Sequence, residues 1–148
     1  MSTASLIRQL RLHEGVEKYV YIDTVGKRTV GVGRNLDDVG LDEDEIDLLL
    51  MNDIQRRACN ELSRVHPAWV LLSEPRQDVL IDMMFNLGAP TLQKFEQMWQ
   101  AIRDQRWADA AEEMLDSKWA RQVGNRALRL AKMMEHNVDF DTALELVP

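Results

Sequence analysis

The sequence predicts an α+β protein that is mostly α, with a small N-terminal lobe containing a β-hairpin, a long connecting helix and a helical C-terminal lobe. Between residues 19 and 33, apolar side chains alternate with others on both sides of a glycine-containing turn, which is typical of a hairpin. From residue 43 onward, apolar residues recur at helical spacing. The chain has 148 residues, of which 45% are hydrophobic, so it is long enough for one domain with a sizeable core.

The N-terminal lobe is predicted to span residues 14–42, after a first helix at residues 3–13. Gly15 is expected to end this helix, because glycine readily adopts the left-handed conformation found at helix ends. The hairpin strands are predicted at residues 19–22 and 29–33. Glycines in the second strand leave it thin, so that another group can approach its backbone closely.

A long helix over residues 43–65 is predicted to link the two lobes. Acids at its start suit a helix N-terminus, and apolar residues recur along it at helical spacing until Pro67 prevents its continuation. The C-terminal lobe, residues 66–148, is predicted to be helical, with methionine and tryptophan packed in its core. Its helices are expected at about residues 73–87, 91–102, 107–115, 125–136 and 141–146.

Charge is unevenly distributed along the chain. The formal net charge is −7, and residues 37–47 hold seven acids and no base. Without this acidic run the formal charge would be zero, so the acidity belongs to one segment of the chain. Residues 118–132 hold five bases and no acid, which suits either contact with an anionic polymer or a solvated helix face.

Several classes of protein lack support in the sequence. Cys59 is the single cysteine, so no intrachain disulfide is expected, and its spacing predicts a buried helix position. No apolar run is long enough for a membrane span and no secretion signal is visible, so we expect folding in a reducing cytoplasm and no stable membrane insertion. His13, His66 and His136 form no metal-binding motif, so neither a metal nor a cofactor is expected.

Three polar residues near the N-terminus carry candidate chemistry. Glu14 lies at the predicted end of the first helix, where the helix dipole favours the protonated acid that can protonate a leaving oxygen. Asp23 lies in the hairpin turn and is expected to be ionised; it can deprotonate a water held by Thr29, or stabilise positive charge at a sugar carbon. The same residues also suit a helix end, a turn and a strand, so spacing alone leaves both interpretations open.

The pattern Glu14, eight residues, Asp23, five residues, Thr29 resembles the catalytic pattern of the phage T4-type lysozymes (endolysins), glycoside hydrolase family 24. The resemblance covers most of the chain and implies a lysozyme-like fold with a single domain over residues 1–148, in which helix 3–13 packs on the C-terminal lobe. Other segments resemble the family in the same order along the chain: Tyr21-Ile22-Asp23-Thr24, Thr29-Val30-Gly31-Val32-Gly33, Met84-Phe85-Asn86-Leu87-Gly88, Ser117-Lys118-Trp119 and Asn125-Arg126-Ala127.

The resemblance implies a muramidase that cuts peptidoglycan at the β-1,4 bond from N-acetylmuramic acid to N-acetylglucosamine. Glu14 is implied as the general acid, and Asp23 with Thr29 as the pair that positions the attacking water, with inversion at the sugar carbon. Supporting residues are implied at the cleft: Arg126 as an ion partner of Glu14, together with Gln122, Phe85 and Asn86.

The family also implies a biological role. The enzyme is expected to be a monomer without a cofactor that collects in the host cytoplasm and acts on peptidoglycan glycan strands in the periplasm after release, so that the host cell lyses. No nucleic-acid partner is expected, because net charge opposes one.

The chain departs from the family pattern at some positions. Arg34 stands where the best-known members have a histidine, so an ion pair of that histidine is absent or rebuilt. His13 stands where the closest-studied relative has an acid, and it either tunes Glu14 by its charge or caps a carbonyl group. The N-terminal lobe is shorter than usual, and residues 37–47 would repel an anionic wall if they faced the cleft.

Two other functions remain open on the sequence. A lytic transglycosylase would use one glutamate without an activated water, which leaves Asp23 and Thr29 without a role; its products would carry 1,6-anhydro ends in place of reducing ends. A non-catalytic wall-binding protein on the same scaffold would pellet with walls without clearing them.

Overall fold

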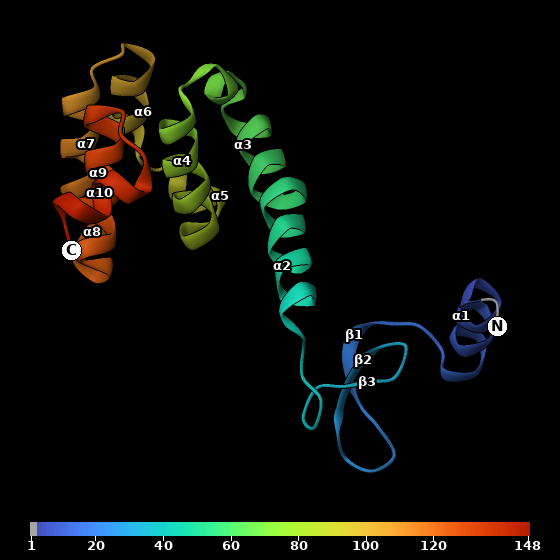
Figure 1. Ribbon diagram of the computed structural model, residues 1–148. Helices are drawn as coiled ribbons and strands as arrows, with labels where there is room; N and C mark the ends of the chain where they lie inside the picture. The colour runs from blue at the N-terminus through green and yellow to red at the C-terminus, as the bar shows by residue number, and fades with distance from the viewer. Residues whose placement is uncertain (1–2) are drawn as a thin grey trace. The chain divides into compact units, whose positions relative to one another are not determined.

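A computed structural model describes residues 3–148 (Figure 1). The described residues are mostly helical and include one three-stranded antiparallel sheet, which confirms the predicted fold class. They divide into two units, and the division falls between Leu50 and Met51. No helix within residues 3–148 combines the length and the apolar character that crossing a membrane requires.

The first unit contains α1 (Thr3–Glu14) and a sheet of β1 (Glu17–Ile22), β2 (Arg28–Gly31) and β3 (Arg34–Asn35) in that order. The predicted first helix and hairpin are confirmed, with Tyr21 opposite Thr29 in the ladder. The predicted second strand was too long. It ends at Gly31, because Gly31 and Gly33 both have positive φ (69° and 70°) and turn the chain into β3, which the sequence did not predict.

The predicted long helix is confirmed. Helical residues follow one another without a break through α2 (Glu43–Asn52), η1 (Asp53–Ala58) and α3 (Cys59–Val65). The middle segment, η1, is π-helical, which was not predicted. The helix ends before Pro67, at His66, whose φ of −142° is not helical. Cys59 is only partly buried, contrary to prediction, and burial raises the pKa of its thiol.

The second unit continues with short helices packed around one core (Figure 1). Its core is rich in methionine, which fills irregular gaps between helices, and the predicted packing of methionine and tryptophan is confirmed: Met83, Met98, Met114 and Met134 are fully buried and Trp99 is 4% exposed. The remaining elements are η2 (Pro67–Leu71), α4 (Glu74–Leu87), α5 (Ala89–Leu92), α6 (Glu96–Arg103), α7 (Trp107–Leu115), α8 (Lys118–Val123), α9 (Asn125–His136) and α10 (Phe140–Leu146).

The predicted helix over residues 91–102 is in fact two helices. Gly88, with φ of 75°, ends α4, and α5 then starts with a proline in its first turn and ends at Leu92. The carbonyl group of Leu92 accepts the N–H of Phe95 at 3.2 Å and the indole N–H of Trp99 at 2.9 Å. These two donors stabilise the break, since they satisfy a carbonyl that a continuous helix would have used.

Candidate active site

Asp23 and Thr29 lie within hydrogen-bonding distance of each other in the first unit. Thr29 Oγ1 is 3.3 Å from Asp23 Oδ2 and 3.2 Å from the carbonyl oxygen of Lys27, so its single proton serves one acceptor at a time. Thr29 is only 3% exposed and is the one buried residue among residues 3–50. The sequence placed this pair correctly on a turn and the following strand.

The turn itself fixes the carboxylate of Asp23. Its Oδ1 atom accepts the backbone N–H groups of Val25 at 3.0 Å and Lys27 at 2.8 Å. The backbone of Asp23 closes the same turn, since its carbonyl accepts the N–H of Gly26 at 3.0 Å. With Oδ1 occupied, Oδ2 faces Thr29 and keeps a lone pair for a water or a substrate group. The arrangement is an oriented carboxylate with a hydroxyl beside it.

Glu14 is the last residue of α1, and its side chain lies beside the turn between β2 and β3. A Cβ atom built on Gly33 would lie 3.6 Å from Glu14 Oε2 and 4.0 Å from Glu14 Cβ. A larger side chain at position 33 would therefore crowd the carboxyl group, and its φ of 70° also favours glycine. The end of α1 and the glycine-containing turn therefore lie close together. This agrees with the prediction that glycines here let another group approach the backbone.

Ion pairs hold the acidic run against the sheet. Lys27 pairs with Asp38 at 2.9 Å, and the side chain and backbone N–H of Arg28 both donate to Asp37. The hydrogen bond from the Lys27 ammonium holds the pKa of Asp38 below its ordinary value. Part of the negative charge of residues 37–47 is therefore balanced within this unit.

In the second unit, Asn86 is oriented by a tryptophan. Asn86 Oδ1 accepts the indole N–H of Trp119 at 2.7 Å, which leaves the amide N–H groups of Asn86 for another partner. Its neighbour Phe85 is 51% exposed and borders a pocket of about 290 Å³ beside η1. Gln122 is exposed on α8.

Arg126 forms an ion pair with Asp82. Its Nε and Nη2 atoms lie 2.9 Å and 2.8 Å from Asp82 Oδ1, which ties α9 to α4. This partner lies 44 residues away in the sequence and could not be identified from spacing. The pairing of Arg126 with Glu14 stays a prediction.

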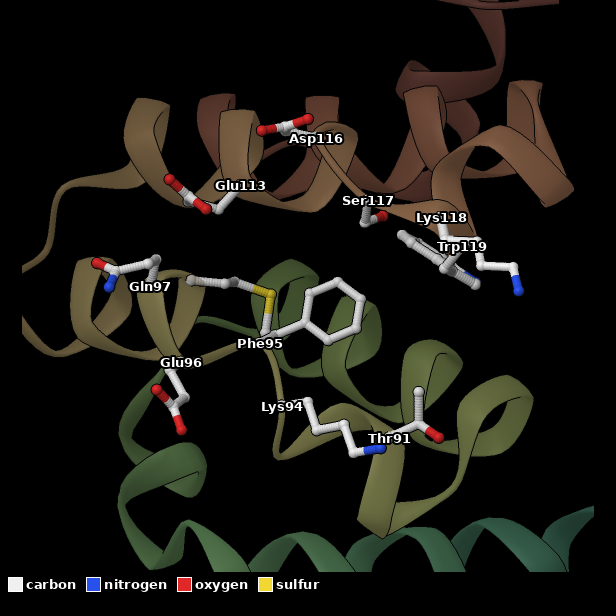
Figure 2. Close-up of a pocket in the computed structure, with 11 residues that line it drawn as sticks. Thr91, Lys94, Phe95, Glu96, Gln97, Glu113, Asp116, Ser117, Lys118 and Trp119 are labelled. Carbon is white, nitrogen blue, oxygen red and sulfur yellow. The ribbon is translucent and has the colours of Figure 1, made fainter.

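A pocket of about 360 Å³ opens between residues 91–98 and 113–119 of the second unit (Figure 2). Phe95 and Trp119 form an apolar part, and their rings meet edge to face with centroids 6.3 Å apart. Charged residues of both signs surround these rings: Lys94, Glu96, Glu113, Asp116 and Lys118. The pocket was not predicted from the sequence, because its residues come from four helices and the segments between them, and each residue alone suits a core or a surface position.

Residues 3–148 contain no group of three or more His, Cys, Asp or Glu side chains that could hold a metal ion. His66 stacks on Trp99, with ring centroids 3.5 Å apart. Burial, and then the charge of Arg103, lower the pKa of His66. This histidine is therefore a packed aromatic residue.

Comparisons with known proteins identify relatives of the chain. The sequence profile of the family described as "Phage lysozyme" matches residues 11–135. Two probable T4-type lysozymes of Dictyostelium discoideum are 24% and 25% identical over 89% of this chain and 94% of their own length. The pre-baseplate central spike protein Gp5 of Enterobacteria phage T4 is 26% identical over 88% of this chain, which corresponds to 27% of that protein. The match spans the segments that hold Glu14, Asp23 and Thr29.

Proposed function

Because the chain belongs to the phage lysozyme family, and is thus a lysozyme whose substrate is peptidoglycan, we propose that Glu14, Asp23 and Thr29 carry out the cleavage. The bond cut is the β-1,4 linkage between N-acetylmuramic acid and N-acetylglucosamine. The hydrogen-bonding geometry of Asp23 and Thr29 carries this proposal, since a buried hydroxyl beside an oriented carboxylate suits the binding of one water. Glu14 supplies the second carboxyl group that glycoside hydrolysis needs.

The proposed reaction moves two protons. Glu14 gives its proton to the glycosidic oxygen as the bond from the sugar carbon breaks. Asp23 Oδ2 takes a proton from the water as its oxygen bonds to that carbon from the opposite face, and Thr29 Oγ1 holds the water in place. The backbone N–H groups of Val25 and Lys27, which donate to Asp23 Oδ1, keep the carboxylate oriented during this step.

Attack from the opposite face has a stereochemical consequence. The first product of a β linkage would be the α anomer, because the configuration of the sugar carbon inverts. The other role of Asp23, stabilising positive charge at the sugar carbon, does not require its carboxylate to face the water. Proton NMR of the product during the first turnover separates the two roles, since early accumulation of the β anomer would contradict activation of water by Asp23.

We further propose that the enzyme acts as a monomeric endolysin. It would collect in the host cytoplasm, reach the periplasm after release and cause lysis by cutting the glycan strands. Family membership supports the cutting of glycan strands in this role. The pocket around Phe95 and Trp119 and the exposed amide of Asn86 are proposed as substrate contacts of the second unit.

The test is clearing of outer-membrane-stripped Gram-negative cells by the wild type, Glu14→Gln and Asp23→Asn, with analysis of the soluble muropeptides. We expect reducing ends from the wild type and at least a hundredfold slower clearing by both variants, because general acid–base groups contribute roughly 10²–10⁴-fold. Glu17→Gln is the matched control, since Glu17 is an exposed acid on β1 close to Glu14 in sequence. Anhydro ends would indicate a transglycosylase, and binding to walls without clearing would indicate a non-catalytic protein.

A further inference from the structure

A pocket of about 620 Å³ is formed by residues 65–76 and 99–107 of the second unit. Its walls are mostly apolar and include Pro67, Trp69, Leu72, Trp99, Ile102 and Trp107. Leu71, which also borders the pocket, is 84% exposed. A concave site of this size with mostly apolar walls is typical of a binding site for a small molecule.

The tryptophans present hydrocarbon to this pocket. The indole N–H of Trp69 donates to Ser63 Oγ at 3.0 Å, and that of Trp99 donates to the carbonyl group of Leu92 at 2.9 Å. Neither acceptor is among the residues that line the pocket. At Trp69 and Trp99 a ligand therefore meets ring carbon atoms and no free N–H group, so it needs an apolar body to displace water from them with a gain in free energy.

Two guanidinium groups, and no carboxylate, belong to the same lining. Arg76 lies 3.7 Å from the ring centroid of Trp107, and its Nε and Nη2 atoms donate to the carbonyl groups of Met134 and Glu135. Arg103 donates one hydrogen bond to Gln100 Oε1 at 2.9 Å. Within the described part of the chain neither arginine has a carboxylate within 4.0 Å, whereas Arg34 and Arg126 each have one. Both arginines keep N–H groups for an anion.

We propose that this pocket binds a small monocarboxylate with an apolar body. The apolar body lies against the tryptophan rings, and the carboxylate accepts hydrogen bonds from the remaining N–H groups of Arg103 and Arg76. The combination of apolar side chains with two arginines that have no carboxylate within 4.0 Å selects this chemistry. A neutral apolar molecule leaves the arginines without an anion, and a small inorganic anion leaves the apolar side chains in water. The site shares no residue with Glu14, Asp23 and Thr29 and belongs to the second unit alone.

Decanoate, below the concentration at which it forms micelles, is a suitable probe. The protein has four tryptophans, and their indole N–H signals are resolved by two-dimensional proton–nitrogen NMR of the full chain. Trp69, Trp99 and Trp107 line this pocket, whereas Trp119 lies in the other one (Figure 2). We expect saturable shifts of the first three signals and none of the fourth. Equal shifts of all four, or no saturation, would overturn the proposal.

The arginine component is tested with Arg103→Gln and with decanol, the uncharged analogue of the probe. We expect Arg103→Gln to weaken decanoate binding about tenfold and to leave decanol binding unchanged, since a charge-assisted hydrogen bond is lost. Arg121→Gln removes an exposed arginine of α8 outside the pocket and is expected to have no effect on either ligand. Equal affinities of the wild type for decanoate and decanol would contradict the proposal.

The apolar component is tested by filling the pocket from its exposed edge. Ala68 lines it and is exposed, so Ala68→Phe adds a ring without disturbing the core. This variant is expected to fold as the wild type does, with an unchanged melting temperature, and to lose binding of both decanoate and decanol. Unchanged binding by the folded Ala68→Phe variant would place the ligand elsewhere and overturn the assignment.

Discussion

Arg34 at the start of β3 forms a two-pronged ion pair with Glu45 in the first turn of α2. Arg34 Nη1 lies 2.7 Å from Glu45 Oε2, and Nη2 lies 2.5 Å from Oε1. Arg34 Nη1 also donates to the carbonyl group of Gly40, and Glu45 Oε2 accepts the backbone N–H of Asp42. The carboxylate of Glu45 therefore contacts both the sheet and the N-terminus of α2. The sequence left an absent or a rebuilt ion pair open at position 34, and the structure shows an ion pair there.

Breaking this pair is expected to loosen the N-terminus of α2. Arg34→Gln and Glu45→Gln should both speed hydrogen exchange at the amide of Asp42 and lower the melting temperature by a few degrees, since each leaves the other charge without its partner. Arg34→Lys should recover only part of the loss, because an ammonium group cannot make the two-pronged contact. The control is Arg64→Gln, which breaks the exposed pair with Glu61. An equal effect of the control and of Arg34→Gln would contradict this prediction.

The hydroxyl of Thr29 is expected to matter for catalysis more than for folding. Thr29→Val keeps the shape of the buried side chain and removes the group 3.3 Å from Asp23 Oδ2. We expect the rate of clearing to fall by about a hundredfold, and Thr29→Ser to retain most of it, because the loss is that of a water-positioning group. Thr24→Val, an exposed position in the same turn, is the control. A Thr29→Val protein that folds and clears cells at the wild-type rate would exclude a role for the hydroxyl.

Acid is expected to weaken the ion pair between Arg28 and Asp37. Hydrogen bonds from the side chain and then the backbone N–H of Arg28 hold the pKa of Asp37 below its ordinary value of 3.8. The folded carboxyl group thus binds its proton less tightly than the unfolded one. The ionised Asp37 contributes fully to the free energy of unfolding at pH values above the ordinary pKa of 3.8. This contribution is lost as the pH falls through the lower pKa that Asp37 has in the folded protein.

Thermal unfolding of the wild type and Asp37→Asn at a series of pH values checks this prediction. The wild type should be the more stable protein at neutral pH, and the difference should shrink from about pH 4 downward. Asp47→Asn is the control, because Asp47 is exposed and has no ion pair among residues 3–148. A difference that grows toward acid would contradict the assignment of the pair to Asp37.

The sequence predicted those features that depend on neighbours along the chain. The hairpin follows from alternation around one turn, and this turn alone brings Asp23 to Thr29. The helix from residue 43 to Val65 follows from its periodicity and from Pro67. The π-helical segment Asp53–Ala58 was not predicted. In a π-helix the backbone hydrogen bonds join residues five apart in place of four, and the spacing of apolar side chains does not reveal this change.

Contacts between segments that are distant in the sequence could not be predicted. The partner of Arg126 is Asp82, which lies 44 residues earlier in the sequence. The two residues meet because α4 packs against α9. The partner of Arg34 is Glu45, one of seven acids in the acidic run, and spacing gives no reason to choose it. The pockets around Trp119 and around Trp107 likewise combine side chains from several helices, each of which alone matches ordinary core packing.

The side-chain amide of Asn86 is expected to have two roles. Its oxygen stabilises the fold by accepting the indole N–H of Trp119, and its N–H groups are proposed to contact substrate. Asn86→Ala leaves the indole N–H of Trp119, a side chain only 4% exposed, without its partner at 2.7 Å, which should lower the free energy of unfolding by about 1–3 kcal/mol. Asn86→Asp keeps an acceptor oxygen and should retain stability, but it removes the amide N–H groups proposed to contact substrate and should raise KM with little change in kcat. Asn60→Ala, which removes an exposed hydrogen bond to Arg56, is the control for stability. If Asn86→Asp is destabilised as much as Asn86→Ala, the acceptor oxygen does not explain the loss of stability. If the KM of Asn86→Asp equals that of the wild type, the amide N–H groups do not contact the glycan.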